Sequence, residues 1–305
     1  MPRYENRPNA CGRGRAGGHG PSDWGHRNNP EPGGRVWRRL PTMFVIGPFP
    51  NSRLATKSMS KRLAIILAAG KGTRMKSELP KVLCPVRGKP MVEFVLAALR
   101  RAGVDHMLVV VGYRSDLVRQ ALRDADDVEF IEQTEQLGTG HAVKMCRAQI
   151  AAHTGPVLIV TGDSPLTQTD SVASLFEEFD RERPACVLGT LHKQNPAGLG
   201  RIVRDDQGRF AAIVEHKDAT PSQQLITEVN MSTYVFDAPK LVRALDVLQN
   251  RNQQKEYYLT DCPGILQAWG EDVRALPVLK PCEALSVNTV DDLAIVEAAM
   301  QEMGL

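Results

Sequence analysis

The stretch that decides the fold is LAIILAAGKGTRM, residues 63–75. Its apolar start, residues 63–67, has the length and position of a buried strand that runs into a glycine-rich turn. The small residues of that turn let backbone N–H groups approach a phosphate chain, and Lys71, Arg74 and Lys81 can neutralise the phosphate charge. The stretch therefore predicts a strand that ends at a triphosphate site, with a purely structural glycine-rich turn as the alternative.

Two common phosphate-binding motifs do not fit this turn. A Walker A loop requires Ser or Thr after Gly-Lys, but Gly70-Lys71 is followed by Gly72. A dinucleotide-binding motif requires a third glycine where Met75 stands, and no ribose-binding acid follows the second predicted strand. Binding of NAD and a P-loop NTPase are therefore disfavoured.

Apolar runs alternate with amphipathic stretches beyond this turn. The alternation predicts strands at 107–111, 128–131 and 156–161, and helices at 90–101, 115–123 (with Ser115 as the N-cap) and 140–150. Such a β-α-β pattern requires crossover connections, so we expect an α/β, Rossmann-like fold with a mostly parallel central sheet and helices on both faces. Ligands in such sheets bind beyond the carboxyl ends of the strands.

The pattern loosens after Cys186. Shorter strands are predicted at 187–191, 200–203, 210–215 and 232–236, followed by helices at 238–248 and 291–303. These strands predict a mixed-strand extension of the sheet that lines the site.

The composition separates a tail from a body. Of 305 residues, 42% are hydrophobic and 24% are charged, as in an ordinary globular domain, which we place at residues 59–305. Residues 1–58 hold 10 of the 38 Lys and Arg and 3 of the 35 Asp and Glu, and are rich in Gly, Pro, Asn and Arg. We expect this tail to be disordered. One explanation is that translation begins at Met43 or Met59; a targeting or RNA-binding tail is the alternative.

Several classes of partner and location are disfavoured. The body has 28 basic against 32 acidic residues and no basic, aromatic-interleaved stripe, so no nucleic acid partner is expected. No apolar stretch approaches the roughly 20 residues that cross a bilayer, so no membrane partner is expected. The six cysteines are scattered without a C-x-x-C pair, which predicts reduced thiols and a cytoplasmic location.

A set of motifs points to one family. LAAGKGTRM (67–75) and Pro80-Lys81 are followed by QTEQLGTGHA (133–142), GRIVR (200–204), VEHKDA (214–219) and EYYLTD (256–261). In this order and spacing the sequence resembles the sugar nucleotidyltransferases, and most closely the N-acetylglucosamine-1-phosphate uridylyltransferase half of the bifunctional bacterial GlmU proteins. The resemblance covers roughly residues 61–290 and implies the nucleotide-diphospho-sugar transferase fold.

The resemblance implies a uracil-nucleotide site. Its residues would be Leu67, Ala68, Ala69, Gly70, Gln133, Gly138 and Thr139. Uracil presents an N–H between two carbonyls, and backbone amides with a glutamine side chain can satisfy all three groups. For Gln133 the alternative is a solvated strand end.

The resemblance also implies a metal and catalytic site. Asp163 and Asn288 would hold Mg²⁺, and Arg74, Lys81 and Asp163 would be the catalytic residues. Few oxygen ligands suit Mg²⁺, which keeps waters and binds substrate phosphates. For Asp163 the alternative is a cap on the following helix.

The implied sugar-binding residues are Gly200, Glu215 and Asn230. Three positions nearby depart from the family pattern, because Leu199 replaces a tyrosine, Asn230-Met-Ser232 replaces Asn-Thr-Gly, and Ser286 replaces the glycine of Gly-Val-Asn. These departures allow a sugar specificity that differs from that of the family.

The implied function is Mg²⁺-dependent transfer of UMP from UTP to N-acetylglucosamine 1-phosphate, giving the cell-envelope precursor UDP-N-acetylglucosamine and pyrophosphate. The alternatives are a transferase for another sugar 1-phosphate and a non-catalytic nucleotide-sugar sensor. Because the sequence contains no hexapeptide repeats, neither acetyltransferase activity nor the β-helix trimer is expected, and the oligomeric state stays open.

Overall fold

The computed structural model describes residues 61–75 and 77–305. The predicted tail at residues 1–58 lies outside the described residues. Among the helices of the described part, none is long and apolar enough to cross a membrane.

The described residues form a nine-stranded sheet in the order β11-β7-β10-β6-β1-β4-β5, with β8 paired to β10 and β9 paired to β8. Its strands are β1 (Leu63–Ala68), β4 (His106–Val111), β5 (Val128–Glu132), β6 (Pro156–Thr161), β7 (Cys186–His192), β8 (Arg201–Arg204), β9 (Phe210–Val214), β10 (Glu228–Asp237) and β11 (Val273–Leu276). Strand β1 is parallel to β4 and β6, β4 is parallel to β5, and β10 is antiparallel to β6 and β7. The mostly parallel sheet and its mixed extension are confirmed.

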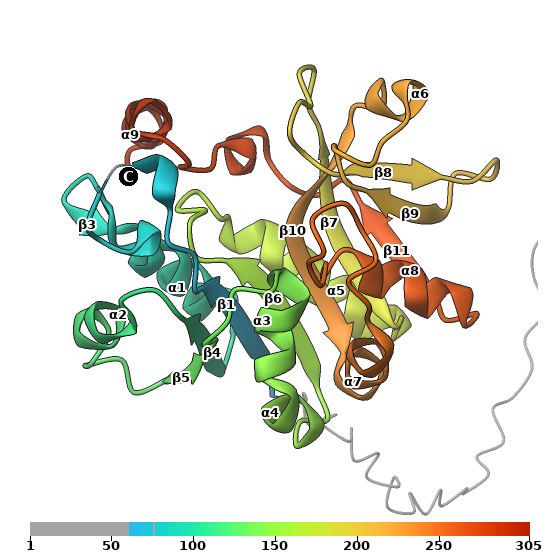
Figure 1. The fold of residues 1–305 in the computed structure, drawn as a ribbon, viewed down its shortest axis with the longest axis horizontal. Coiled ribbons are helices and arrows are strands. Elements are labelled where there is room, and N and C mark those ends of the chain that lie inside the picture. The colour runs from blue at the N-terminus through green and yellow to red at the C-terminus, as the bar shows by residue number, and fades with distance from the viewer. Residues whose placement is uncertain (1–60, 76) are drawn as a thin grey trace, which may run out of the picture. The chain divides into compact units, whose positions relative to one another are not determined.

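Side chains of β1 alternate between two apolar cores. Leu63 and Ile65 pack with residues of α3 (Thr139–Met145), α4 (Arg147–Ala151), α7 (Ala238–Val247) and α8 (Asp261–Ala268). Ala64 and Ile66 pack with residues of α1 (Met91–Arg101), α2 (Ser115–Ala121) and α5 (Thr169–Glu182). Strand β1 is thus buried from both sides, which explains its unbroken apolar run. Figure 1 shows α3, α4 and α7 in front of the sheet.

The remaining elements lie outside these two layers of helices. They are the turns η1 (Thr73–Met75), η2 (Lys81–Leu83) and η3 (Pro281–Ala284), the hairpin β2 (Pro85–Val86) and β3 (Lys89–Pro90), and the helices α6 (Pro221–Gln224) and α9 (Val290–Glu302). The chain from β1 to α1 therefore passes through η1, η2 and the hairpin before a long helix begins.

The elements α5, α8 and β11 had no counterpart in the prediction, and three further details differ from it. The helix expected at 140–150 is two helices, α3 and α4, because Cys146 has a ψ of 5° that interrupts the helical backbone. Ser115 is not the N-cap of α2, since it is already helical and Arg114 precedes it with a left-handed φ of 50°. Strand β10 begins at Glu228, earlier than the predicted 232, and its register shifts between Asn230 and Tyr234.

Strand β10 connects the two parts of the sheet. Its second half pairs with β6, where Tyr234 is opposite Ile159, and its first half pairs with β8, where Val229 is opposite Arg201. Ser232, between these halves, has a left-handed φ of 55°. The β8–β9 ribbon is thus hydrogen-bonded to the sheet through the first half of β10.

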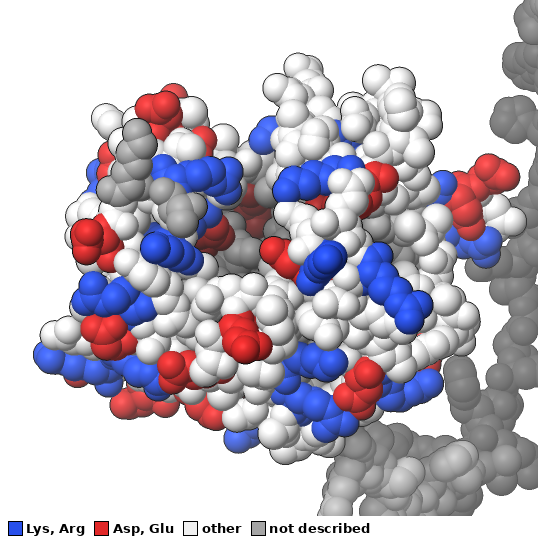
Figure 2. Space-filling model, viewed as in Figure 1, with Lys and Arg blue, Asp and Glu red and all other residues white. Residues whose placement is uncertain are grey.

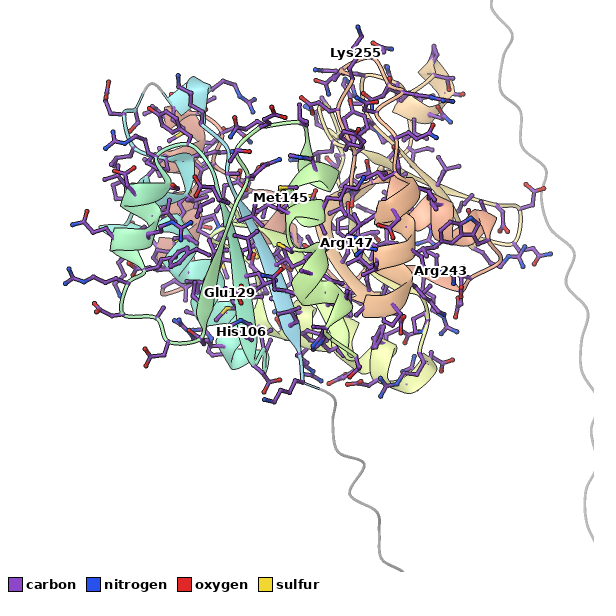
Figure 3. The ribbon with its side chains drawn as sticks, turned by 60° about the horizontal axis from the view of Figure 1, so that its bottom comes forward. His106, Glu129, Met145, Arg147, Arg243 and Lys255 are labelled. Carbon is purple, nitrogen blue, oxygen red and sulfur yellow. The ribbon has the colours of Figure 1, made fainter. Side chains whose placement is uncertain are left out.

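The amino and carboxyl edges of the parallel strands have different side chains beside them. At the amino edge, His106 on β4 and Glu129 on β5 lie 3.4 Å apart (Figure 3). Apart from Asn288, which lies just before α9, the residues predicted for nucleotide and metal lie at or beyond the carboxyl ends of β1, β5 and β6. The fold therefore gathers them at one edge of the sheet.

Candidate active site

A cavity of about 220 Å³ lies beyond the carboxyl ends of β1 and β5. It is lined by Leu67, Ala69, Gly70, Gln133, Gln136, Gly138, Thr139, Ala142 and Glu256. The structure thus brings together the predicted nucleotide residues except Ala68, whose side chain lies on the opposite face of β1 in the other core. Gln136 and Glu256 were not predicted as site residues, although both lie in motifs of the family resemblance, at 133–142 and 256–261, which could have identified them.

Gln133 is built into the wall of this cavity. It follows β5 and is 3% exposed, so the alternative of a solvated strand end is wrong. Its Nε2 donates to the carbonyl of Gly138 at 3.2 Å and lies 3.0 Å from Nδ1 of His141. The side-chain amide therefore fixes the loop that carries the other predicted nucleotide residues.

Gly138 allows two loops to pack backbone against backbone. Its φ is +107°, and a Cβ there would lie 2.6 Å from the carbonyl oxygen of Tyr257. The neighbouring N–H of Gly140 donates to that same oxygen at 2.8 Å. The wall of the cavity consequently requires a residue without a side chain at position 138.

Four charged or polar side chains meet where β6 ends. Nζ of Lys81 donates to Oδ2 of Asp163 and, at 2.8 Å, to Oδ1 of Asn288. NH2 of Arg74 donates to the same Oδ1 at 3.1 Å. The structure therefore brings together the predicted catalytic and metal-binding residues, although Asn288 is 125 residues beyond Asp163 in the chain.

The structure places one sequence alternative, the helix-cap role of Asp163, and one predicted phosphate-neutralising cation, Lys71. Asp163 does not cap the following helix, because α5 begins at Thr169 with Gln168 as its N-cap. Lys71 is not in the cluster around Asn288; its ammonium lies 5.2 Å from the centre of the Tyr113 ring.

The oxygen atoms at this corner fit a Mg²⁺ ion. Oδ2 of Asp163 and Oδ1 of Asn288 both accept from one ammonium, so the two oxygens face a common point that holds a positive charge. One carboxylate and one amide oxygen are the kind of small donor set that Mg²⁺ uses together with water and substrate phosphates. Among residues 61–75 and 77–305, no group of three His, Cys, Asp or Glu side chains could hold a metal.

The predicted sugar residues also converge, at the start of β8. A Cβ on Gly200 would lie 3.6 Å from both the Cβ of Asn230 and Oε2 of Glu215, and the N–H of Asn230 donates to the Gly200 carbonyl at 2.9 Å. Oε1 of Glu215 accepts from the Thr260 hydroxyl at 3.0 Å. Burial raises the pKa of Glu215, and the Thr260 hydrogen bond offsets only part of that rise.

A second cavity, of about 560 Å³, joins the charged corner to Asn230. It is lined by residues of η1, the β7–β8 loop, β10 and α9 and by the segment 284–288, among them Arg74, Asp163, Lys193, Asn230, Ser232, Ser286, Asn288 and Asp292. Figure 2 shows a hollow in this face with basic side chains on both of its margins. Lys193 was missed from the sequence, although it directly follows β7 as Gln133 follows β5, a position that could have identified it.

Comparison with known proteins gives the family. The profile of the MobA-like NTP transferase domain matches residues 64–229, more than half of the chain. The chain belongs to this family. It is therefore a nucleotidyltransferase-family protein, which confirms that part of the prediction.

Two GlmU proteins are similar to most of this chain. The chain is 44% identical over 241 residues to the bifunctional protein GlmU of Listeria monocytogenes serotype 4a, covering 79% of this chain and 52% of that protein. It is 42% identical over 244 residues to the bifunctional protein GlmU of Shouchella clausii, covering 80% of this chain and 53% of that protein. The chain thus spans about half the length of these relatives.

A solved structure supports the fold. The crystal structure of UDP-glucose pyrophosphorylase complexed with UDP-glucose superposes with a TM-score of 0.64 at 16% identity, covering 80% of this chain and 100% of that chain. This likeness confirms the α/β fold predicted from the alternation of strands and helices, and the nucleotidyltransferase fold that the family resemblance implied.

Proposed function

We propose that the protein transfers UMP from UTP to a sugar 1-phosphate, with N-acetylglucosamine 1-phosphate as the first candidate, releasing UDP-sugar and pyrophosphate. The observation that carries the proposal is the 560 Å³ cavity, which is lined by Asp163 and Asn288 of the Lys81–Asp163–Asn288 cluster and also by Asn230. The predicted nucleotide residues other than Ala68 line the separate 220 Å³ cavity. One cavity has the polar groups that uracil requires, and the other contains an amide and hydroxyls suited to a sugar. The similarity to GlmU proteins agrees with this choice of substrates.

In the proposed reaction, an oxygen of the sugar phosphate attacks the α-phosphorus of UTP. A new P–O bond forms as the bond from the α-phosphorus to the oxygen bridging to the β-phosphate breaks, and pyrophosphate leaves with the bonding electrons. The phosphate nucleophile is ionised at neutral pH, so no general base is required. Arg74 and Lys81 would neutralise the phosphates and hold the attacking oxygen in line with the leaving group.

Asp163 and Asn288 would hold the Mg²⁺ ion. Such an ion would supply further neutralisation of the charge on the phosphates. Lys81 already bonds to both oxygen atoms, so its ammonium can exchange these contacts for phosphate oxygens when substrate and metal are bound.

Pyrophosphate release tests the proposal. UTP, dTTP and CTP are each combined, with Mg²⁺, with N-acetylglucosamine 1-phosphate, glucosamine 1-phosphate and glucose 1-phosphate. Release confined to UTP with the acetylated sugar would support the proposed nucleotide and the proposed sugar. A preference for another pair would assign the protein a different reaction of the same family. No release with any pair would favour a nucleotide-sugar sensor.

Metal removal has a predicted outcome. Excess EDTA should lower pyrophosphate release by at least about a hundredfold, because the triphosphate charge would then be opposed by side chains alone. Added Mg²⁺ should restore the rate. Thermal unfolding in EDTA serves as the control, since Asp163 retains Lys81 as a partner without metal and the fold should be unaffected. Full activity in EDTA would contradict the proposal that the reaction requires a metal ion.

Glu215→Gln should weaken acceptor binding selectively. The carboxylate beside Gly200 would accept from sugar hydroxyls, and its neutral replacement offers a weaker acceptor. We expect the KM for the sugar phosphate to rise about tenfold, with the KM for UTP unchanged. Steady-state kinetics with each substrate varied in turn measures this; equal changes in both KM values would contradict the assignment.

The same substitution should change stability in a pH-dependent way. Because burial raises the pKa of Glu215 in the folded chain, ionisation of this carboxyl costs folding free energy above that pKa and nothing below its unfolded pKa. Glu215→Gln should therefore be more stable than the parent chain in urea unfolding at pH 8. The gain should shrink as the pH falls toward 4; a gain that is constant with pH would argue against a raised pKa.

A further inference from the structure

We propose that Lys193 binds an anionic group of the acceptor substrate and so contributes to the choice of sugar. The anionic group is either the 1-phosphate or an acidic substituent on the sugar ring. This inference rests on the proposed function, because it names a further feature of the acceptor that the same site would recognise.

Lys193 is held at the edge of the 560 Å³ cavity. Its backbone N–H donates to the carbonyl of Thr227 at 2.9 Å, which continues the pairing of β7 with β10 and fixes the backbone. Its side chain is half-buried and lines the cavity together with Asn230 and Ser286. The ammonium therefore faces the space where the acceptor would bind.

The charge of this ammonium is not matched by a carboxylate. Among the described residues, no Asp or Glu oxygen forms an ion pair with Lys193; Nζ instead lies 3.5 Å from the carbonyl oxygen of Ala284. That distance is long for a hydrogen bond, so the contact is weak. A partly desolvated cation without a counter-charge is costly, and an anionic ligand would remove that cost.

Neighbouring charges, in contrast, have partners. Lys280 pairs with Asp170, and Glu283 accepts from the Ser171 hydroxyl at 2.6 Å. Asp292 accepts from the backbone N–H groups of residues 288 and 289 at 2.9 and 2.8 Å. Lys193 is thus left as a positive charge that the surrounding segments do not neutralise.

The position of Lys193 assigns it to the acceptor rather than to UTP. Arg74 and Lys81 meet at Asn288, beside the carboxyl ends of β1 and β6, whereas Lys193 extends from β7. Strand β7 neighbours β10, in which Asn230 lies opposite Thr190. Lys193 and Asn230 therefore belong to the paired strands that form the acceptor side of the cavity.

The experiment uses the full chain, with Lys193→Gln, Lys193→Arg and the control Lys89→Gln. Lys89 is an exposed lysine on β3 outside this cavity. With UTP and Mg²⁺, kinetics are measured for glucose 1-phosphate, N-acetylglucosamine 1-phosphate and glucuronic acid 1-phosphate. We expect Lys193→Gln to raise the acceptor KM at least about tenfold with the UTP KM unchanged, Lys193→Arg to recover most of the loss, and Lys89→Gln to match the parent.

The three acceptors distinguish the two sources of negative charge. A loss confined to glucuronic acid 1-phosphate assigns Lys193 to a ring carboxylate, and an equal loss for all three assigns it to the 1-phosphate. Unchanged acceptor KM values in Lys193→Gln would overturn the inference and leave Lys193 as a structural contact to Ala284.

A binding measurement separates this inference from the proposed function. If the parent chain releases no pyrophosphate with any acceptor, the proposed function fails. Isothermal titration calorimetry of the three sugar phosphates with the parent and Lys193→Gln then tests Lys193 directly. Binding weakened at least about tenfold in the variant would support the inference, and equal or absent binding in both proteins would overturn it.

Discussion

Replacing Asp163 by asparagine is expected to lower kcat by about a hundred- to a thousandfold while the chain stays folded. The carboxylate is the counter-charge of Lys81 and, in the proposed site, the charged ligand of Mg²⁺. Asparagine keeps the shape but removes the negative charge, so the charged ligand of the proposed metal and the counter-charge of Lys81 would both be lost. The cost in stability should be small, because the Asp163 side chain is 22% exposed and Lys81 keeps its bond to Asn288.

Pyrophosphate release and thermal unfolding measured on the same preparation check this expectation. Asp170→Asn is the matched control, since it removes an exposed carboxylate that pairs with Lys280 outside the site, and such pairs contribute little. Near-normal turnover in Asp163→Asn would remove both the metal assignment and the catalytic role of this residue.

Gly138→Ala is expected to destabilise the chain by roughly 2–5 kcal/mol and to raise the KM for UTP at least about tenfold. Alanine would have to adopt a left-handed φ of +107° with its Cβ 2.6 Å from the carbonyl oxygen of Tyr257. Relief requires the loops around residues 138 and 257 to separate, and Gln133 bonds to the first of them. The base-binding cavity should open as a result.

Gly208→Ala provides the control for backbone strain alone. Gly208 lies in the β8–β9 turn with a φ of +76°, but a Cβ there has no atom within 4 Å. We expect a loss of about 1–2 kcal/mol in urea unfolding and an unchanged KM for UTP. If both variants behaved alike, the close approach to Tyr257 would not be what shapes the cavity.

The core of the fold could be predicted because its strands are short apolar runs buried on both faces. Strand β6, Pro156–Thr161, was predicted with its observed ends. Elements whose limits depend on tertiary contacts were harder to predict. The first half of β10 contains the polar residues Glu228 and Asn230, which are buried because they form hydrogen bonds to other segments and not because they are apolar. The break at Cys146 likewise has no glycine or proline to signal it.

The candidate site was predicted mainly by motif, and the structure explains which parts a motif cannot supply. Ala68 lies within the phosphate-turn motif, yet the alternation of β1 turns its side chain into the core. That Lys81 bonds to both Asp163 and Asn288 depends on how three distant segments meet. Lys193 lies in no motif; its place directly after β7 was the one sequence signal, and the cavity and its unmatched charge identify it in the structure.

The attachment of the β8–β9 ribbon through one half of β10 has a consequence for how this protein can evolve. Strand pairing joins the ribbon to the sheet through β10, whose register shifts around Ser232. Side chains add hydrogen bonds to other elements, from Arg204 to the Ala275 carbonyl of β11 and from Gln267 of α8 to the Phe210 carbonyl. With the proposed function, mutations in the ribbon would change the acceptor side of the site while the proposed nucleotide and metal residues beside β1, β5 and β6 stay the same. We therefore expect that replacing residues 193–232 with those of a relative that uses a different acceptor is the smallest exchange that changes which nucleotide sugar is formed.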